Sequence, residues 1–314
     1  MDKKRLVPLL ALPVIWGSYY VASHEALAVM SVFSVGIVIR VITLILLTAL
    51  MAARGEIGQL FRIQHVWKWL CMIGLMGFLL DTTAFIGLQL SPAGIGTALL
   101  KCDILFVNLI SMLVCRERFT AADWGLSLLM LFGVFLVLEV DPAHLDLFNV
   151  GNIFFILSAL FVSINAFLIK AAQHHPKNPA GDRVIAYYNN LITLILFLFA
   201  ASVTRQMGEL TRMKGERGLL LALAVSGVGQ TMIYIVYYYD LRCNPVWIVK
   251  VILLLMPIVA SVLGLILFGD AMSITQCVGL VIVLAGALCI LVLHHCRELK
   301  QAPQQANEGK EDQL

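Results

Sequence analysis

Long apolar runs recur along the whole of this 314-residue chain. A helix needs about 20 mainly apolar residues to cross the hydrocarbon core of a bilayer. Only 13% of the residues are charged, whereas soluble domains carry about 25%. Ten runs are long enough to span, at roughly 6–24, 30–53, 66–88, 93–115, 122–140, 149–171, 183–204, 217–240, 245–268 and 273–295. The sequence therefore predicts an all-α membrane protein with ten transmembrane helices.

Basic residues are distributed unevenly between the connections of these spans. Lys and Arg are enriched in cytoplasmic loops, and with the N-terminus inside, most of them fall on the inner side. The outer side then holds only a few, all in one loop: Arg205, Arg212, Lys214 and Arg217. This distribution predicts an N-in, C-in topology. The polar stretch 296–314, of mixed charge, predicts a disordered cytoplasmic tail.

Two stretches of the chain resemble each other. Residues 104–138 align with 257–291, which places Gly133 opposite Gly286. Each repeat unit then holds five spans, and because this number is odd, the two copies must insert with opposite orientations. The sequence thus predicts two inverted five-helix repeats, residues 1–140 and 149–295. Transporters built from inverted repeats place the substrate site between them.

Short motifs occur at matching places in the two repeats. The first span contains "PVIWGSYYVASHEAL" with its Trp16-Gly17 pair, and an acidic residue ends the fourth and ninth spans in "CRERFTAADW" and "FGDAMSITQCVG". Pro257 precedes Asp270 by thirteen residues. With these motifs, over roughly 6–292, the chain resembles the drug/metabolite transporter superfamily of the EamA-domain type. Arg116-Glu117 and Asp270 depart from that family's usual Gly-Glu and Glu.

The resemblance implies a fold and an activity. It implies ten spans as five plus five, with a central cavity lined by helices of both halves. It also implies a secondary transporter or exporter of small metabolites such as amino acids. The motifs are short and mostly apolar, so they indicate the fold well and the substrate poorly.

Five ionisable residues lie inside the apolar spans: Arg40, Asp81, Lys101, Asp103 and Lys250. A charge at bilayer depth costs roughly 2.5–3.5 kcal/mol unless it faces the protein interior or a water-filled cavity. The sequence therefore predicts a polar chamber within the helical bundle. Three cations against two carboxylates leave a net charge of +1, which favours an anionic or zwitterionic solute.

Lys101 and Lys250 are the first candidates for solute contact. They differ by one helical turn in the repeat alignment, so they are nearly symmetric about the predicted two-fold axis. Two ammonium groups facing one cavity would favour a carboxylate, phosphate or sulfonate. As an alternative, each lysine is neutralised by an internal carboxylate, or Lys250 extends to the cytoplasmic surface.

Asp103 follows Lys101 by two positions, about 200° around a helix, so the two are expected on different faces. The polar face of Lys101 continues through Asn108, and Asp103 then needs Arg40 or Lys250 as its partner.

Asp81 and Arg40 both lie in the middle of a span, so an ion pair between them is expected. The alternative is that Asp81 or Asp103 couples transport to protons and loses its proton when the pocket opens.

Polar and aromatic residues supply further candidates. Tyr237, Tyr238 and Tyr239 are expected in an interfacial aromatic belt. Tyr234 lies a turn deeper, one turn from Gln230, and both are expected to line the cavity wall together with Trp16 and Asn108. The alternative is that these polar side chains tie neighbouring helices together.

No nucleotide-binding loop, metal-ligand cluster or nucleophile motif occurs in the sequence. The sequence predicts no enzyme activity, cofactor, metal or nucleic-acid partner. The predicted partners are a small-molecule substrate, the lipid bilayer and, as one alternative, protons, with a monomer and a homodimer both open. A compact ten-span chain with a short tail is typical of a bacterial inner membrane. The same chamber also fits an alternative function, a flippase for lipid headgroups or lipid-linked substrates, or a membrane enzyme.

Overall fold

The computed structural model describes residues 3–63, 65–90, 98–116, 119–141, 149–175, 181–213, 216–259, 262 and 273–311. The described residues form helices and no strands. The helices in chain order are α1 (Lys3–Leu27), α2 (Val32–Ala53), η1 (Ile57–Phe61), α3 (Trp67–Leu90), α5 (Asp103–Val114), α6 (Ala121–Val137), α7 (Val150–Gln173), α8 (Asp182–Val203), η3 (Met207–Met213), α9 (Arg217–Cys243), α10 (Val246–Leu253) and α12 (Ile274–Glu311). Glu117 and Asp270, the acidic residues of the two span-ending motifs, lie outside the described residues.

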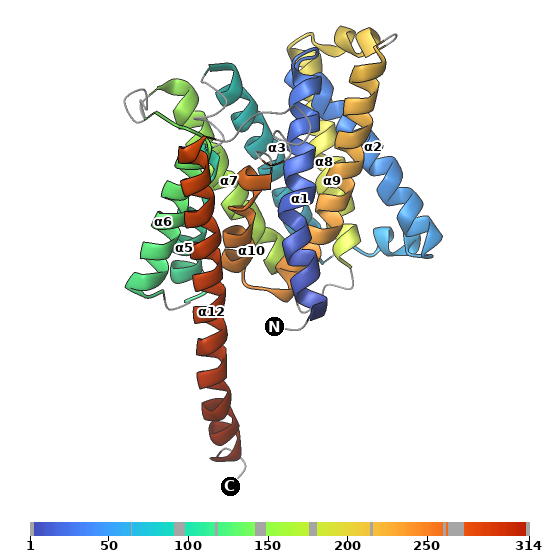
Figure 1. The fold of residues 1–314 in the computed structure, drawn as a ribbon. Coiled ribbons are helices and arrows are strands. Elements are labelled where there is room, and N and C mark those ends of the chain that lie inside the picture. Colours follow the sequence, from blue (N-terminus) through green and yellow to red (C-terminus); the bar gives the residue numbers. More distant parts are fainter. Residues whose placement is uncertain are drawn as a thin grey trace.

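Within the described part of the chain, five helices are long and apolar enough to cross a membrane: Leu6–Leu27, Val32–Ala53, Val150–Gln173, Asp182–Val203 and Arg217–Cys243. Three further apolar helices are shorter, Ala121–Val137, Val246–Val259 and Ile274–Ile290. The chain is therefore a multi-pass helical membrane protein. The count of ten spans and the N-in, C-in topology stay predictions, although the start of α1 and the end of α12 lie toward the same end of the bundle (Figure 1).

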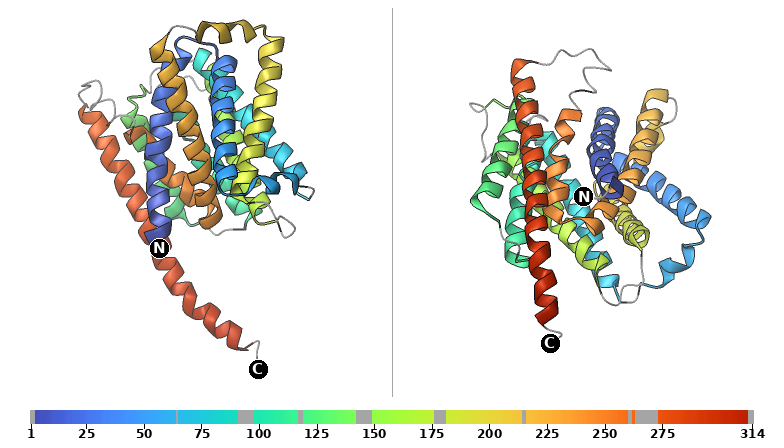
Figure 2. Two further views of the ribbon diagram at one scale, coloured as in Figure 1. Left: turned by 90° about the vertical axis from the view of Figure 1, so that its right-hand side faces the viewer. Right: turned by 60° about the horizontal axis from the view of Figure 1, so that its bottom comes forward.

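Helices of the two predicted repeats interleave and do not form two separate bodies (Figure 2). The most extensive contacts join α1 to α9, α3 to α7, α6 to α12 and α2 to α8, each time one helix from each repeat. α1 and α3 are the first and third predicted spans of the first repeat, and α7 and α9 are the first and third of the second. The α1–α9 and α3–α7 contacts therefore each join the first span of one repeat to the third span of the other. The packing therefore agrees with a two-fold relation between the repeats.

Glycines allow α6 and α12 to approach closely. A Cβ atom added to Gly279 of α12 would lie 2.6 Å from the main-chain oxygen of Gly133 in α6. Real Cβ atoms are not found at such distances, so a larger residue would force the two helices apart. This close contact fixes the pair of helices along one side of the bundle (Figure 2).

The fourth helix of each predicted repeat is interrupted by a turn. In the first repeat the turn lies at 101–102, directly before α5, and in the second it lies at 254–255, after which helix resumes at 256–259. The alignment of residue 104 with residue 257 places these two turns at equivalent positions. The two predicted spans at 93–115 and 245–268 therefore each contain a turn at the same place of the repeat.

Both turns are tightened in the same way. The N–H of Cys102 donates to the carbonyl of Leu99, and the N–H of Leu255 donates to the carbonyl of Ile252, each at 3.0 Å. These bonds reach back three residues, as in a 3₁₀ turn, and not four as in an α-helix. In the second repeat Pro257 explains the break, because it has no N–H to donate to the carbonyl four residues earlier.

The last helix, α12, continues to Glu311 and extends well beyond the bundle (Figure 1). The disordered cytoplasmic tail at 296–314 stays a prediction.

Candidate functional site

A cavity of about 190 Å³ lies between helices of both predicted repeats, and we call it the central cavity. Its walls include all five ionisable residues that the sequence places inside spans: Arg40, Asp81, Lys101, Asp103 and Lys250. These residues come from α2, α3, the turn before α5, α5 itself and α10. The structure therefore brings together side chains that are up to 210 positions apart in the sequence.

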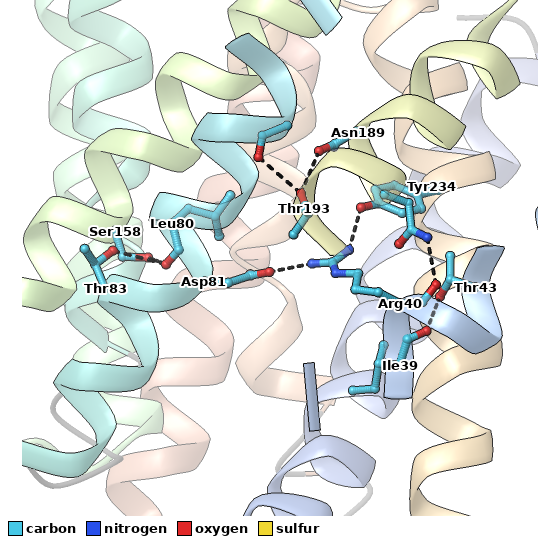
Figure 3. Close-up of polar contacts among 12 residues, drawn as sticks. Ile39, Arg40, Thr43, Leu80, Asp81, Thr83, Ser158, Asn189, Thr193 and Tyr234 are labelled. Atoms are coloured by element: carbon cyan, nitrogen blue, oxygen red, sulfur yellow. Dashed lines mark hydrogen bonds and ion pairs between the residues drawn. The ribbon is translucent and has the colours of Figure 1, made fainter. Parts of the chain in front are cut away.

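Arg40 forms the centre of one polar network in this cavity (Figure 3). One of its guanidinium nitrogens, Nη2, lies 2.5 Å from Oδ2 of Asp81. The other, Nη1, donates to the hydroxyl of Tyr234 at 2.5 Å. Its main-chain carbonyl accepts a hydrogen bond from Asn190 of α8 at 2.8 Å. Arg40 thus ties α2 to α3, α8 and α9, and its charge is matched by Asp81.

Lys250 forms a second ion pair. Its ammonium lies 2.9 Å from Oδ2 of Asp103, and only 1% of its side chain is exposed. The same ammonium lies 5.7 Å from the ring centre of Tyr237. Of the alternatives weighed from the sequence, the structure shows neutralisation by an internal carboxylate, because a lysine buried to this extent does not extend to the surface.

Lys101 lines the cavity without a carboxylate partner among the described residues. Its one recorded hydrogen-bond partner is the sulfur of Met256, 3.8 Å from its ammonium, and a thioether is a weak acceptor. Lys101 and Asp103 both line the cavity, although the sequence places them on different faces. That expectation is wrong because it assumed a regular helix through a position where the turn at 101–102 changes the direction of the side chains.

The other predicted site residues are divided between the cavity and the helix contacts. Trp16, Gln230 and Tyr234 line the cavity. Asn108 does not: its amide donates to the hydroxyl of Ser127 in α6 at 3.0 Å, and it is buried there. The predicted polar face running from Lys101 to Asn108 assumed the same regular helix, so the turn explains this difference too.

Two tyrosines on α9 that sequence reasoning assigned to an interfacial belt are part of the cavity. Tyr237 and Tyr238 line it and are buried, whereas their neighbour Tyr239 is exposed. The hydroxyl of Tyr238 accepts a hydrogen bond from Asn189 at 2.7 Å. Their spacing of three and four positions from Tyr234 could have revealed them, because residues so spaced share a helix face.

A second cavity, of about 710 Å³, lies next to the first. It is lined by the start of α1, the segment with η1, the start of α8 and the later part of α9. Two ion pairs cross it: Arg183 with Glu56, and Arg242 with Asp182 at 2.7 Å. Tyr234 lines both cavities, so α9 forms the wall between them.

The described residues contain no group of three or more His, Cys, Asp or Glu side chains that could hold a metal ion. The polar groups of the central cavity are instead ammonium, guanidinium, carboxylate, amide and phenol groups. Such groups can bind a small polar solute by ion pairs and hydrogen bonds.

Fold and cavity together define a class, the multi-pass helical membrane proteins in which two repeats surround a polar chamber. The model of the EamA-like transporter family matches residues 6–139 and 149–292. The chain therefore belongs to the EamA-like transporter family, which confirms the resemblance seen in the sequence motifs.

One solved structure, titled only "Crystal structure of protein", is similar to this chain with a TM-score of 0.74 and 18% sequence identity. The similarity covers 95% of this chain and 100% of that one. At this level of identity the likeness shows the fold alone. No curated protein matches the chain.

Proposed function

We propose that this chain is a secondary transporter, an exporter or an exchanger, of a small polar organic metabolite. The solute is anionic or zwitterionic, such as an organic acid or an amino acid, and it moves by alternating access around the central cavity between the two repeats. Membership of the EamA-like transporter family supports transport. The observation that carries the choice of solute is the position of Lys101 in the cavity.

The charge balance of the cavity favours an anion. Arg40 and Lys250 are each matched by one carboxylate, so Lys101 leaves the described lining with a net positive charge. A partly buried ammonium such as that of Lys101 is unfavourable without a counter-charge. A carboxylate or phosphate group that enters the cavity would supply the missing negative charge beside Lys101.

Within the proposed class, the same balance favours an organic anion over an amino acid. The ammonium group of a zwitterion would need a free carboxylate, and both described carboxylates of the cavity, Asp81 and Asp103, already have a cation partner. The walls also include the rings of Trp16, Tyr19 and Tyr237. An anion with an apolar or aromatic body would therefore fit this lining best.

The volume of the cavity is compatible with a small solute. At about 190 Å³ it exceeds many times the roughly 10–15 Å³ that one water molecule needs. A small organic acid fits this space.

A thermal-shift screen of the purified protein tests the proposal. Organic acids, amino acids, sugar phosphates and nucleosides are added one at a time, and a bound solute raises the apparent melting temperature by mass action. We expect the largest shift from an organic anion. Lys101→Gln should abolish this shift and Lys101→Arg should retain part of it. Lys68→Gln, at an exposed lysine of α3, is the matched control and should leave it unchanged.

Two results would contradict the proposal. A shift that is the same in Lys101→Gln and in the unmodified protein would exclude Lys101 as the anion contact. Stabilisation by lipid headgroups alone would favour the flippase alternative. Uptake of the stabilising solute into vesicles containing the purified protein then measures transport itself.

A further inference from the structure

Among the described residues, Asp240 is a fully buried carboxyl group without a hydrogen-bond partner. Its exposed fraction is 0%, and neither of its two side-chain oxygens accepts a hydrogen bond there. The carboxylates that line the central cavity are different, because Asp81 and Asp103 each lie within 3 Å of a cation, at 2.5 and 2.9 Å. Asp240 therefore needs an explanation that the ion pairs of the cavity do not supply.

Asp240 occupies a particular place on α9. The preceding residues Tyr237 and Tyr238 line the central cavity, and the flanking residues Tyr239 and Arg242 line the second cavity. Asp240 thus belongs to the part of α9 that separates the two cavities.

The charged groups around the end of α9 have their own partners. Lys170 of α7 donates to two main-chain carbonyls at this helix end, those of Leu241 at 3.2 Å and Asn244 at 2.6 Å. On α9 itself the titratable neighbours of Asp240 are Tyr237, Tyr238, Tyr239, Arg242 and Cys243.

The facing part of α8 carries two charged residues, and both are engaged. Asp182 pairs with Arg242 at 2.7 Å, and Arg183 pairs with Glu56. Neither provides a counter-charge to Asp240.

The remaining helices against α9 give the same result. The one charged residue of α10 is Lys250, which pairs with Asp103. In α1 the basic residues Lys3, Lys4 and Arg5 stand at its start, and the stretch 6–18 has no titratable side chain. In α2 the stretch 41–53 has none. The oxygens of Asp240 have no hydrogen-bond partner among the described side chains.

An ionised carboxylate that is shielded from water and lacks a cation is strongly unfavourable. A carboxyl group in this environment holds its proton and stays neutral. When water reaches it, the O–H bond can break, the proton passes to water and the carboxylate remains. The group can then take up a proton again before it is buried once more.

We propose that Asp240 is a proton-binding site that couples the movement of α9 to the proton gradient. Its protonation stands independently of the transported solute, whereas its coupling role rests on the proposed transport function. Asp81 and Asp103, which the sequence suggested for proton coupling, serve as counter-charges to Arg40 and Lys250.

Infrared spectroscopy of the full-length protein in lipid vesicles tests the protonation directly. A protonated carboxyl group has a carbonyl band that is distinct from the bands of a carboxylate. We expect this band at neutral pH, and we expect its loss in Asp240→Asn, which keeps the shape and neutrality of the side chain. Asp182→Asn, at an ion-paired carboxylate, is the control and should retain the band. A band unchanged by Asp240→Asn, or its absence from the unmodified protein, would overturn the proposal.

Transport tests the coupling, with radiolabelled phenylpyruvate as a defined aromatic organic anion. A gradient of one pH unit should change its accumulation by the unmodified protein by up to about tenfold per coupled proton. Asp240→Asn should abolish this dependence and preserve exchange at equal pH on both sides. A pH dependence that survives in Asp240→Asn would refute the coupling role. If phenylpyruvate is not moved but the infrared band is lost in Asp240→Asn, the proton site stands and the proposed solute class fails.

Discussion

The two ionic clusters of the central cavity neutralise their cations in different ways. Around Arg40, one guanidinium faces one carboxylate and one phenol hydroxyl, so the cluster is balanced (Figure 3). Around Asp103, two lysines line the cavity and only Lys250 has the carboxylate. The first cluster therefore links helices, and the second leaves the ammonium of Lys101 without a carboxylate among the described residues, which the proposed function assigns to the solute. Charged residues inside a membrane protein can serve structure and function within one chamber.

Arg40→Ala should have the largest effect on stability and tests the structural role of the first cluster. It leaves the largely buried carboxylate of Asp81, 21% exposed, without a cation, which costs about 3 kcal/mol. Denaturant unfolding in mild detergent measures this loss. The double variant Arg40→Met/Asp81→Met removes both charges and should recover most of it. A loss below about 1 kcal/mol, typical of a surface pair, would contradict the comparison.

Asp103→Asn should be the next most destabilising change. It leaves the buried ammonium of Lys250 without its counter-charge, at a cost of about 3 kcal/mol. The same unfolding measurement applies, and Lys250→Met in the same chain should restore part of the stability. If the two substitutions simply added their losses, the two residues would not be coupled and the ion pair would not stabilise the fold.

Tyr234→Phe should have a smaller effect. It removes the hydroxyl that accepts a hydrogen bond from Arg40, and a hydrogen bond to a charged group is worth about 1.5 kcal/mol or somewhat more. Tyr187→Phe, whose ring packs on Tyr188 with ring centres 5.9 Å apart, is the matched control. An equal loss in both variants would show that the hydroxyl of Tyr234 has no special role in the first cluster.

Lys101→Gln should have the smallest effect on stability, because no carboxylate loses its partner. We expect a change of less than about 1 kcal/mol, since the substitution breaks no buried ion pair. Anion binding in the thermal-shift screen should nevertheless be lost. A large destabilisation would place Lys101 in the same structural class as Arg40 and would remove the contrast between the two clusters.

Several features could be predicted from the sequence because they depend on local composition. Apolar runs of sufficient length indicate the helices, the similarity of 104–138 to 257–291 indicates two repeats, and the motifs around Trp16 indicate the family. The contact between Arg40 and Asp81 was also expected, because two opposite charges at similar depth in neighbouring spans stabilise each other.

Other predictions from the sequence are wrong, each for a physical reason that the structure shows. Asn108 was expected beside Lys101 because a regular helix places them on one face, but the turn at 101–102 redirects the chain. Tyr237 and Tyr238 were assigned to the membrane interface because of their position near a helix end, whereas they face the cavity. The sequence does not indicate that Asp240 is buried, because a buried and an exposed carboxyl group near a helix end have the same sequence pattern.

The sequence by itself determined that this chain is a helical membrane protein with two repeats, because bilayer thickness and backbone hydrogen bonding leave few other folds for such apolar runs. Only the tertiary structure decided which charges are matched. Lys250 pairs with Asp103, whereas Lys101 has no carboxylate partner and Asp240 no hydrogen-bond partner among the described residues. These differences depend on distances of a few ångströms between helices that are remote in sequence. Electrostatic energy varies with such distances and with burial, and neither quantity is encoded in the local order of residues.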